Sequence, residues 1–188
     1  MGQNSPYEAQ IRELFGRVAW SHKTHEKCAD IALIKYQRIK LAQTILSALT
    51  TTGLLVTISN ELQVQWIPIV SAILSAILFS INLYVKGHDY GKIATQHSET
   101  ACNLWDIRES YVSLLVDIYN SSITDEEIIS KRDSLQKRLG EIYKTSPRTT
   151  SSGYNKASKA LQEKEELTFS DRELDRLLPT YIRKTNKD

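Results

Sequence analysis

Three histidines and two cysteines are the side chains of this sequence best suited to bind a metal ion. His22, His25 and Cys28 lie close together near the N-terminus, and His97 and Cys102 form a second group much later. Imidazole nitrogen and thiolate sulfur are common zinc ligands. The spacing matches neither a zinc finger nor a zinc ribbon, and a histidine at a helix interface is often only a packed, hydrogen-bonded residue. The pattern therefore predicts no metal site, with zinc binding as the alternative.

Other patterns that would indicate catalysis do not occur in the sequence. It contains no glycine-rich phosphate loop, nucleophile elbow or His-Glu-x-x-His pattern. Its net charge of +2 is too small to indicate nucleic-acid binding, and its two cysteines do not indicate a secreted disulfide scaffold. We therefore expect a protein without catalytic residues or a cofactor, and without direct sequence-specific contact with nucleic acid.

The elements that must position these residues depend on a long uncharged region. Between Lys40 and Lys86 the only charged residue is Glu61. A helix rises about 1.5 Å per residue, so the runs on either side of Glu61 are each long enough to cross a hydrocarbon core of about 30 Å. The run that includes WIPIVSAILSAILFSINLYV is the more apolar one. Two transmembrane spans are therefore expected, at about residues 41–60 and 66–85.

A soluble helical bundle with this hairpin as its core is the alternative. Two consecutive uncharged runs of this length are unusual in a soluble domain, so the pattern favours membrane insertion. Cytoplasmic flanks of spans are rich in Lys and Arg, which sets the orientation. Basic residues are more frequent just before the first span than just after the second: Lys23, Lys27, Lys35, Arg38 and Lys40 against Lys86 and Lys92. Both termini are therefore expected in the cytoplasm.

Apolar residues recur at alternating spacings of four and three beyond both spans. One seam runs from Ile11 to Ile39 and the other from Tyr90 to Ile118, which predicts two long helices packed antiparallel. A turn centred near residue 62 would pair positions whose numbers add to about 124, and this places His25 beside Glu99. The candidate contacts of this cytosolic coil are His22, His25, His97 and Glu99.

The rest of the chain is polar and carries helix-start signals. Thr124 and Glu127, and later Ser170 and Glu173, have the spacing of a capping box. The charge-rich helices of the C-terminal tail are expected to be solvated, with docking onto a partner as the alternative. The expected organisation is an N-terminal cytosolic helix (1–40), a transmembrane hairpin (41–85), cytosolic helices (86–144), a linker (145–153) and a helical tail (154–188).

Polar and small residues form stripes along the two expected spans. The first span carries Gln43, Ser47, Thr50 and Thr57 within about 40° of one direction on an ideal helix. The second span carries small or polar residues suited to close helix contact: Ser71, Ala72, Ser75, Ala76, Ser80 and Asn82. Either both stripes only pack the hairpin, or the polar stripe lines water in an oligomer while the small stripe packs.

The chain resembles the SLATT domain over roughly residues 8–145. The resemblance rests on the segment WSHKTHEKCADIALIKYQRI, on two closely spaced spans and on the long cytosolic helix that follows. It implies a bacterial two-span protein encoded beside a nucleotide-second-messenger synthase, a SLOG sensor protein or a reverse transcriptase. SLATT proteins are taken to be inner-membrane effectors that kill or arrest an infected cell. The family has no sharp catalytic motif, so the resemblance assigns a role to few residues.

Sequence and resemblance together predict an all-α membrane protein whose two-helix transmembrane hairpin extends into long cytosolic antiparallel helices, followed by short C-terminal helices. The leading hypothesis is a non-enzymatic antiphage effector that a partner triggers to oligomerise and permeabilise the inner membrane. One hairpin cannot enclose water, so this function requires a homo-oligomer in the lipid bilayer. The alternative is an anchor or adaptor that recruits a partner enzyme, such as a reverse transcriptase or a nucleotide synthase.

Overall fold

The computed structural model describes residues 6–59 and 66–184, and the chain is all-α over these residues, without a β-strand. The helices in chain order are α1 (Pro6–Ser59), α2 (Trp66–Gly87), α3 (Tyr90–Tyr119), α4 (Asp125–Thr145), α5 (Ser151–Gln162), α6 (Asp171–Leu177) and the 3-10 helix η1 (Thr180–Ile182). The turn expected between the two spans falls at residues 60–65 and lies outside the described residues.

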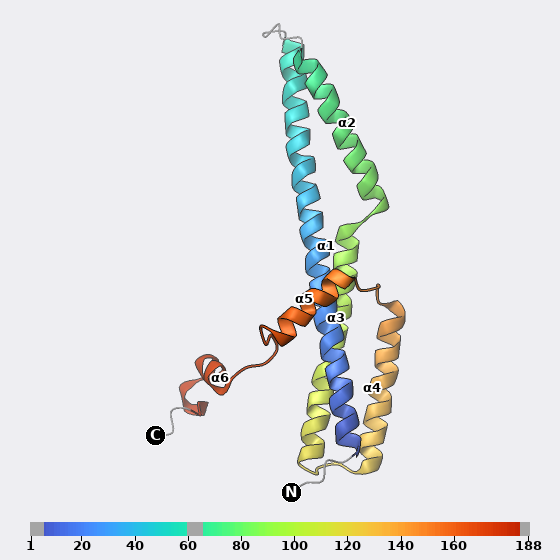
Figure 1. The fold of residues 1–188 in the computed structure, drawn as a ribbon, viewed down its shortest axis with the longest axis vertical. Helices are drawn as coiled ribbons and strands as arrows, with labels where there is room; N and C mark the ends of the chain where they lie inside the picture. Colours follow the sequence, from blue (N-terminus) through green and yellow to red (C-terminus); the bar gives the residue numbers. More distant parts are fainter. Residues whose placement is uncertain (1–5, 60–65, 185–188) are drawn as a thin grey trace.

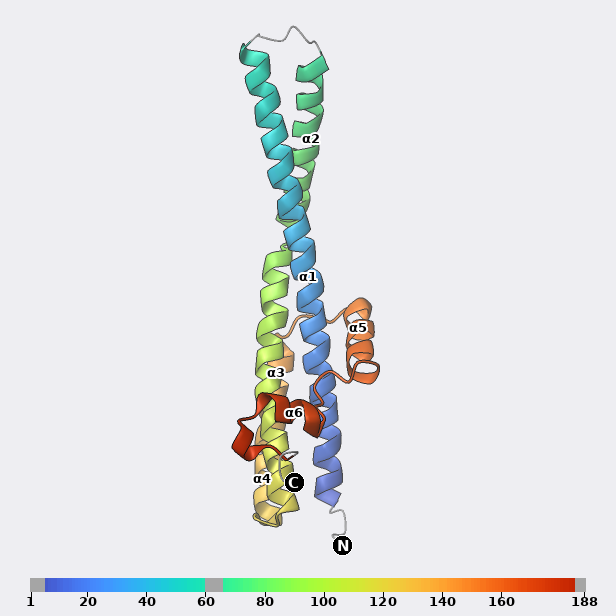
Figure 2. The same ribbon diagram turned by 90° about the vertical axis from the view of Figure 1, so that its left-hand side faces the viewer.

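Helix α1 forms the long axis of the molecule (Figure 1). Helix α2 lies beside one end of α1, and α3 and α4 lie beside the other end, as the view turned by 90° also shows (Figure 2). The expected hairpin with long helical extensions is therefore the architecture of the described chain. α1 continues from the extension into the first span without interruption, because no proline interrupts residues 7–59.

The second arm of the hairpin is interrupted where α2 gives way to α3. Helix α2 ends at Gly87, and the side chain of Asp89 accepts a hydrogen bond from the Lys92 backbone N–H, which caps the start of α3. The rings of Tyr84 and His88 stack with centroids 4.7 Å apart, and the Tyr84 and Tyr90 hydroxyls are 2.8 Å apart. Because the helix restarts here, the face that α3 presents to α1 is independent of the face that α2 presents.

The apolar ends of α1 and α2 are exposed. This exposure distinguishes a membrane hairpin from the buried core of a soluble bundle. Both contain a segment long and apolar enough to cross a membrane, and the buried share of that segment is 0% in α1 and 6% in the second arm. Leu55, Ile58 and Phe79 are 63%, 78% and 63% exposed. A contiguous apolar surface of this size marks a membrane or a protein interaction site, and both segments have the length and composition of membrane spans. The hairpin is therefore assigned as the membrane-spanning part, because within the described chain it is not buried as the core of a soluble bundle would be.

The buried core of the protein lies in the helical extension outside the hairpin, where α3 packs on α1 and α4 packs on α3. Its central residues are Ile11, Val18, Leu104, Ile107, Tyr111, Leu114 and Leu135. The capping box predicted at Thr124 and Glu127 starts α4, and the Tyr143 hydroxyl of α4 donates a hydrogen bond to Ser21 of α1 over 2.9 Å. One side of α1 therefore packs along its whole length: it meets α2 in the hairpin, and it meets α3 and α4 beyond the hairpin.

Helix α5 is not a solvated helix, so the expectation for the tail is wrong at this point. It begins at Ser151, inside the stretch expected as a linker, and its small residues Gly153, Ala157 and Ala160 are buried. A Cβ atom on Gly153 would overlap Cys28 Sγ of α1, so only glycine permits this close approach. The second predicted capping box, Ser170 with Glu173, starts α6.

Candidate functional site

The inner face of the transmembrane hairpin is held by one close contact and one hydrogen bond. At the end near the turn, Gly53 of α1 lies against Ser71 of α2, where an added Cβ would overlap the serine hydroxyl. Toward the end of the hairpin where α3 follows, Gln43 Nε2 donates a hydrogen bond to Asn82 Oδ1 over 2.7 Å. In lipid such a pair is satisfied only by its partner, so the bond links the two helices at this level.

The polar residues predicted to line a pore do not lie on one water-facing side. Gln43 and Thr50 are half-buried on the face of α1 that meets α2, whereas Ser47 and Thr57 are exposed. The Thr50 hydroxyl donates to the Leu46 carbonyl over 2.7 Å, and the Thr57 hydroxyl donates to the Gly53 carbonyl over 2.8 Å. Within one chain, the centre of this stripe therefore lies on the face that meets α2, and the assignment of these residues to a pore lining stays a prediction.

The small residues predicted to pack the hairpin also divide into two sets. Ser71 is 4% exposed, and Asn82 bonds to Gln43, so both contact α1. The other four, Ala72, Ser75, Ala76 and Ser80, are exposed. The residues of α2 that are half-buried against α1 are Ile67, Leu74, Leu78, Ile81 and Val85. With Ser71 they repeat at spacings of four and three, a signal in the sequence that the search for small residues missed.

The side of α1 opposite α2 carries a second set of hydroxyl groups. Thr44, Thr51 and Thr52 are exposed there, and each hydroxyl donates to the carbonyl four residues earlier over 2.9 Å. This bond satisfies the hydroxyl proton inside the helix and leaves the oxygen able to accept from water. An apolar helix can thus present a polar face in lipid without an unsatisfied donor.

In the helical extension outside the hairpin, α1 and α3 meet through a cluster of histidines. The Nδ1 atoms of His25 and His97 are 2.9 Å apart, so one of them donates to the other. His22 Nδ1 lies 2.9 Å from the backbone oxygen of Ala101. Burial, and then the nearby His97 and His22, lower the pKa of His25 to about 4, and burial also lowers the pKa of His97. Both rings are therefore neutral at neutral pH.

Glu99, the fourth predicted contact of the coil, is not part of this cluster. It is exposed on α3, and the residue beside His25 is His97. The histidine–cysteine group also does not converge, because Cys28 faces Thr150 at the start of α5 and Cys102 is exposed. The described residues contain no group of three or more His, Cys, Asp or Glu side chains placed to hold a metal ion.

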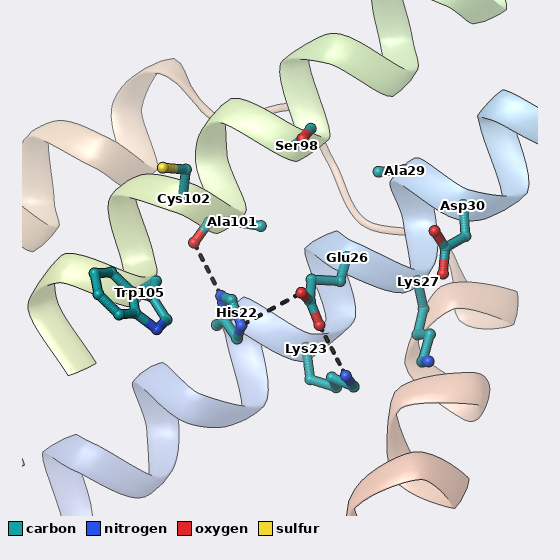
Figure 3. Close-up of a pocket in the computed structure, with 10 residues that line it drawn as sticks. All are labelled: His22, Lys23, Glu26, Lys27, Ala29, Asp30, Ser98, Ala101, Cys102 and Trp105. Atoms are coloured by element: carbon teal, nitrogen blue, oxygen red, sulfur yellow. Dashed lines mark hydrogen bonds and ion pairs between the residues drawn. The ribbon is translucent and has the colours of Figure 1, made fainter. Parts of the chain in front are cut away.

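A surface pocket of about 530 Å³ adjoins the histidine cluster between α1 and α3. Figure 3 shows His22 between the Ala101 carbonyl of α3 and the Glu26 carboxylate of α1, with Trp105 on the far wall. Lys23 lies 2.8 Å from Glu26 and 2.7 Å from Glu166. Burial opposes the charge of Lys23, but hydrogen bonds to Glu166 and Glu26 outweigh it and raise the lysine pKa. With its cation already paired, the pocket does not indicate an anion-binding site.

The tail closes the other side of this region through α5. Glu166, which follows α5, bonds to Lys23 and also to Lys27, 3.2 Å away. Hydrogen bonds to these two lysines lower the Glu166 pKa. The rings of Trp20 and Tyr154 pack with centroids 5.6 Å apart. Sequence reasoning missed this docking, although the Gly153, Ala157 and Ala160 spacing of a small-residue face was visible.

Comparison with known protein families gives one match. The family model for the SMODS and SLOG-associating 2TM effector domain, family 4, matches residues 7–173. The matched range begins in the first turn of α1 and ends in α6, so it covers both the hairpin and the helices that extend from it. No curated protein and no solved structure matches the chain.

Proposed function

The chain belongs to the SMODS and SLOG-associating 2TM effector domain family 4, which makes it a two-span membrane effector of conflict systems, and we propose that its triggered copies assemble in the membrane and permeabilise it. The assembly is a homo-oligomer in the bacterial inner membrane, and it forms in response to phage infection. Both termini of each copy lie in the cytoplasm. The effect is physical rather than enzymatic: ions cross the membrane along a polar path between hairpins.

The observation that carries this proposal is the exposed hydroxyl face of α1. The inner face of the hairpin is held by Gly53 against Ser71 and by the Gln43–Asn82 bond, and two helices cannot enclose a water-filled path across a membrane. Thr44 and Thr51 lie one above the other on the opposite side of α1 and are exposed. Placed side by side in several copies, these faces supply acceptor oxygens along a shared path.

Contacts between hairpins are supported by small exposed residues of α2. Ala72 and Ser75 are exposed, and they are separated around the helix from the residues that meet α1. Small side chains let helix backbones approach closely in lipid, where van der Waals packing drives association. In this arrangement α2 joins the copies and the outer face of α1 lines the path.

The test compares leakage with assembly in matched variants. Thr44→Leu with Thr51→Leu makes the outer face apolar, and an apolar constriction can exclude water, so ion leakage should be abolished while membrane level and oligomer size stay unchanged. Thr50→Leu is the control on the inner face and should instead disturb the hairpin contact. Leakage from liposomes is measured per inserted oligomer. Undiminished leakage from the outer-face double variant would reject this face as the path.

A second candidate function is recruitment of a partner at the far cytosolic end. A groove of about 510 Å³ lies between α1 and α3 and includes Phe15, Val112, Leu115, Val116 and Tyr119. Val116 and Tyr119 are 52% and 86% exposed, and apolar exposure of this kind marks interaction surfaces. We propose that the trigger protein, a nucleotide synthase or a reverse transcriptase, docks here. Toxicity that needs no partner, and that survives Val116→Asp, would argue against this role.

A further inference from the structure

A groove runs along the lipid-facing side of the hairpin between α1 and α2. It has a volume of about 690 Å³, and it is lined mainly by apolar and small side chains, among them Ala42, Ile73, Ala76, Ile77 and Tyr84, with Arg38 at one end. The lining residues of both helices belong to the exposed or half-buried part of the hairpin. The groove is thus a hollow on the membrane-embedded surface with one cationic end.

The shape of the groove follows from how the two helices are held. Near the turn, Gly53 against Ser71 brings the backbones close together. At the other end of the hairpin, the helices are linked through the side chains of Gln43 and Asn82 instead of a direct contact such as that at Gly53. In this direction α1 and α2 separate in the view of Figure 1, whereas they cross in the view of Figure 2. The small residues Ala42 and Ala76 leave the resulting wedge open instead of filling it.

The mouth of the groove carries one cation, Arg38, and two lysines lie within three residues of it in the sequence. Arg38 and Tyr84 line it, and Arg38 precedes the uncharged segment by only two residues. Lys35 lies over the ring of Tyr90 and Lys40 over the ring of Tyr36, at 5.3 and 5.7 Å from the centroids. Among the ion pairs of the described residues, none involves Arg38. The mouth therefore presents positive charge at the level of lipid headgroups.

From this juxtaposition we propose that the groove binds an anionic phospholipid, with one acyl chain lying against Ala42, Ile73 and Ile77 and the phosphate at Arg38. Basic pockets between spans on the cytoplasmic side are suited to anionic headgroups. A helix of a second copy would cover the apolar wall but would leave the Arg38 charge without a partner, whereas a phosphate supplies one. The site does not depend on pore formation, because it belongs to a single hairpin.

The experiment counts lipids retained by the full-length protein. The purified protein is exchanged from detergent into nanodiscs of phosphatidylcholine with phosphatidylglycerol, released, and weighed by native mass spectrometry. The wild type should retain phosphatidylglycerol in preference to phosphatidylcholine. Arg38→Gln should lower phosphatidylglycerol retention by about fivefold, and Arg38→Lys should restore most of it. Ala42→Leu should lower retention by filling the groove, whereas Ala48→Leu, which adds the same volume on the outer side of α1, should not.

Each other outcome overturns the proposal. If Arg38→Gln lowers retention but Ala42→Leu does not, the headgroup is attracted by surface charge and the groove holds no chain. If neither changes retention, the lipid is not selected here. If Ala42→Leu instead changes the oligomer mass with lipid retention unaltered, a second copy occupies the groove. Elution volume and helical circular dichroism check folding, and Ala76→Leu is a second groove-filling variant should Ala42→Leu fail this check.

Discussion

Acidification should destabilise the cytosolic coil, because the His25–His97 contact requires neutral imidazoles. The two Nδ1 atoms are 2.9 Å apart, and this geometry holds one shared proton between them. Protonation of the accepting ring would place two N–H donors against each other and one positive charge in a buried site; both side chains are under 5% exposed. The perturbation is therefore a fall in pH, and its target is a specific contact between α1 and α3.

The size of the effect follows from the His25 pKa, which falls from an ordinary 6.5 to about 4 in the folded protein. Between these values the unfolded chain binds more protons than the folded one, so stability falls as pH falls through this window. The difference of about 2.5 pH units between the unfolded and folded pKa values corresponds to a maximum loss of about 3 kcal/mol in the free energy of unfolding. About 2 kcal/mol of this is lost between about pH 7.5 and pH 5. The lowered pKa of His97 acts in the same direction.

The assay is denaturant unfolding of the full-length protein in detergent, followed by circular dichroism at both pH values. His25→Asn keeps a hydrogen-bonding group near the position of Nδ1 but removes the titration, so its stability should depend less on pH. His88→Asn changes an exposed histidine outside the coil and should keep the wild-type dependence. Stability that is constant, or that rises on acidification as a His25–Glu99 pair would make it, would refute the assignment of His97 as the partner.

Three further outcomes test the spans and the core. Gly53→Ala should destabilise the hairpin by about 1–3 kcal/mol, because the added Cβ would overlap Ser71 Oγ, and a second change, Ser71→Ala, should restore the stability. Gly140→Ala, which has open space around it, is the control for helix propensity. Equal thermal midpoints for the Gly53→Ala and Gly140→Ala variants would contradict the contact. Tyr111→Phe should stabilise the protein by about 1 kcal/mol in denaturant unfolding, because the buried Tyr111 hydroxyl has no partner among the described residues, and a loss of stability would reveal a missed partner. A reporter active only outside the cytoplasm should work near Gln63 and fail after Asp188; activity after Asp188 would reject the topology.

Local signals in the sequence were enough to predict the two apolar helices, the long helices that extend from them and both capping boxes. The uncharged runs fix where lipid can surround the chain, and the alternating spacing of four and three fixes that α1 and α3 pack along their length. Thr124 and Ser170 start their helices through contacts only three residues away. Such features depend on neighbours in the chain and need no knowledge of distant contacts.

Only the tertiary structure decided which residues of one helix face which residues of the next. Asp89 restarts the helix after α2, so the rotation of α3 about its axis is not continued from the span. His25 consequently meets His97 and not Glu99, a shift of two residues that turns a helix by about 200° and exchanges a buried position for an exposed one. In the spans, composition picked out small residues, but the contact at Gly53 and Ser71 selected which side of α2 meets α1.

The same distinction explains the tail. The polarity of the linker and tail predicted exposure. Helix α5 nevertheless packs on α1, because Gly153 leaves room for Cys28 and because Glu166 reaches Lys23 and Lys27. Composition therefore determined that this protein spans a membrane twice as a helical hairpin. Which faces meet, and which remain for lipid or for another copy, depended on close approaches between residues far apart in the sequence, since periodicity alone does not fix the rotation of one helix against another.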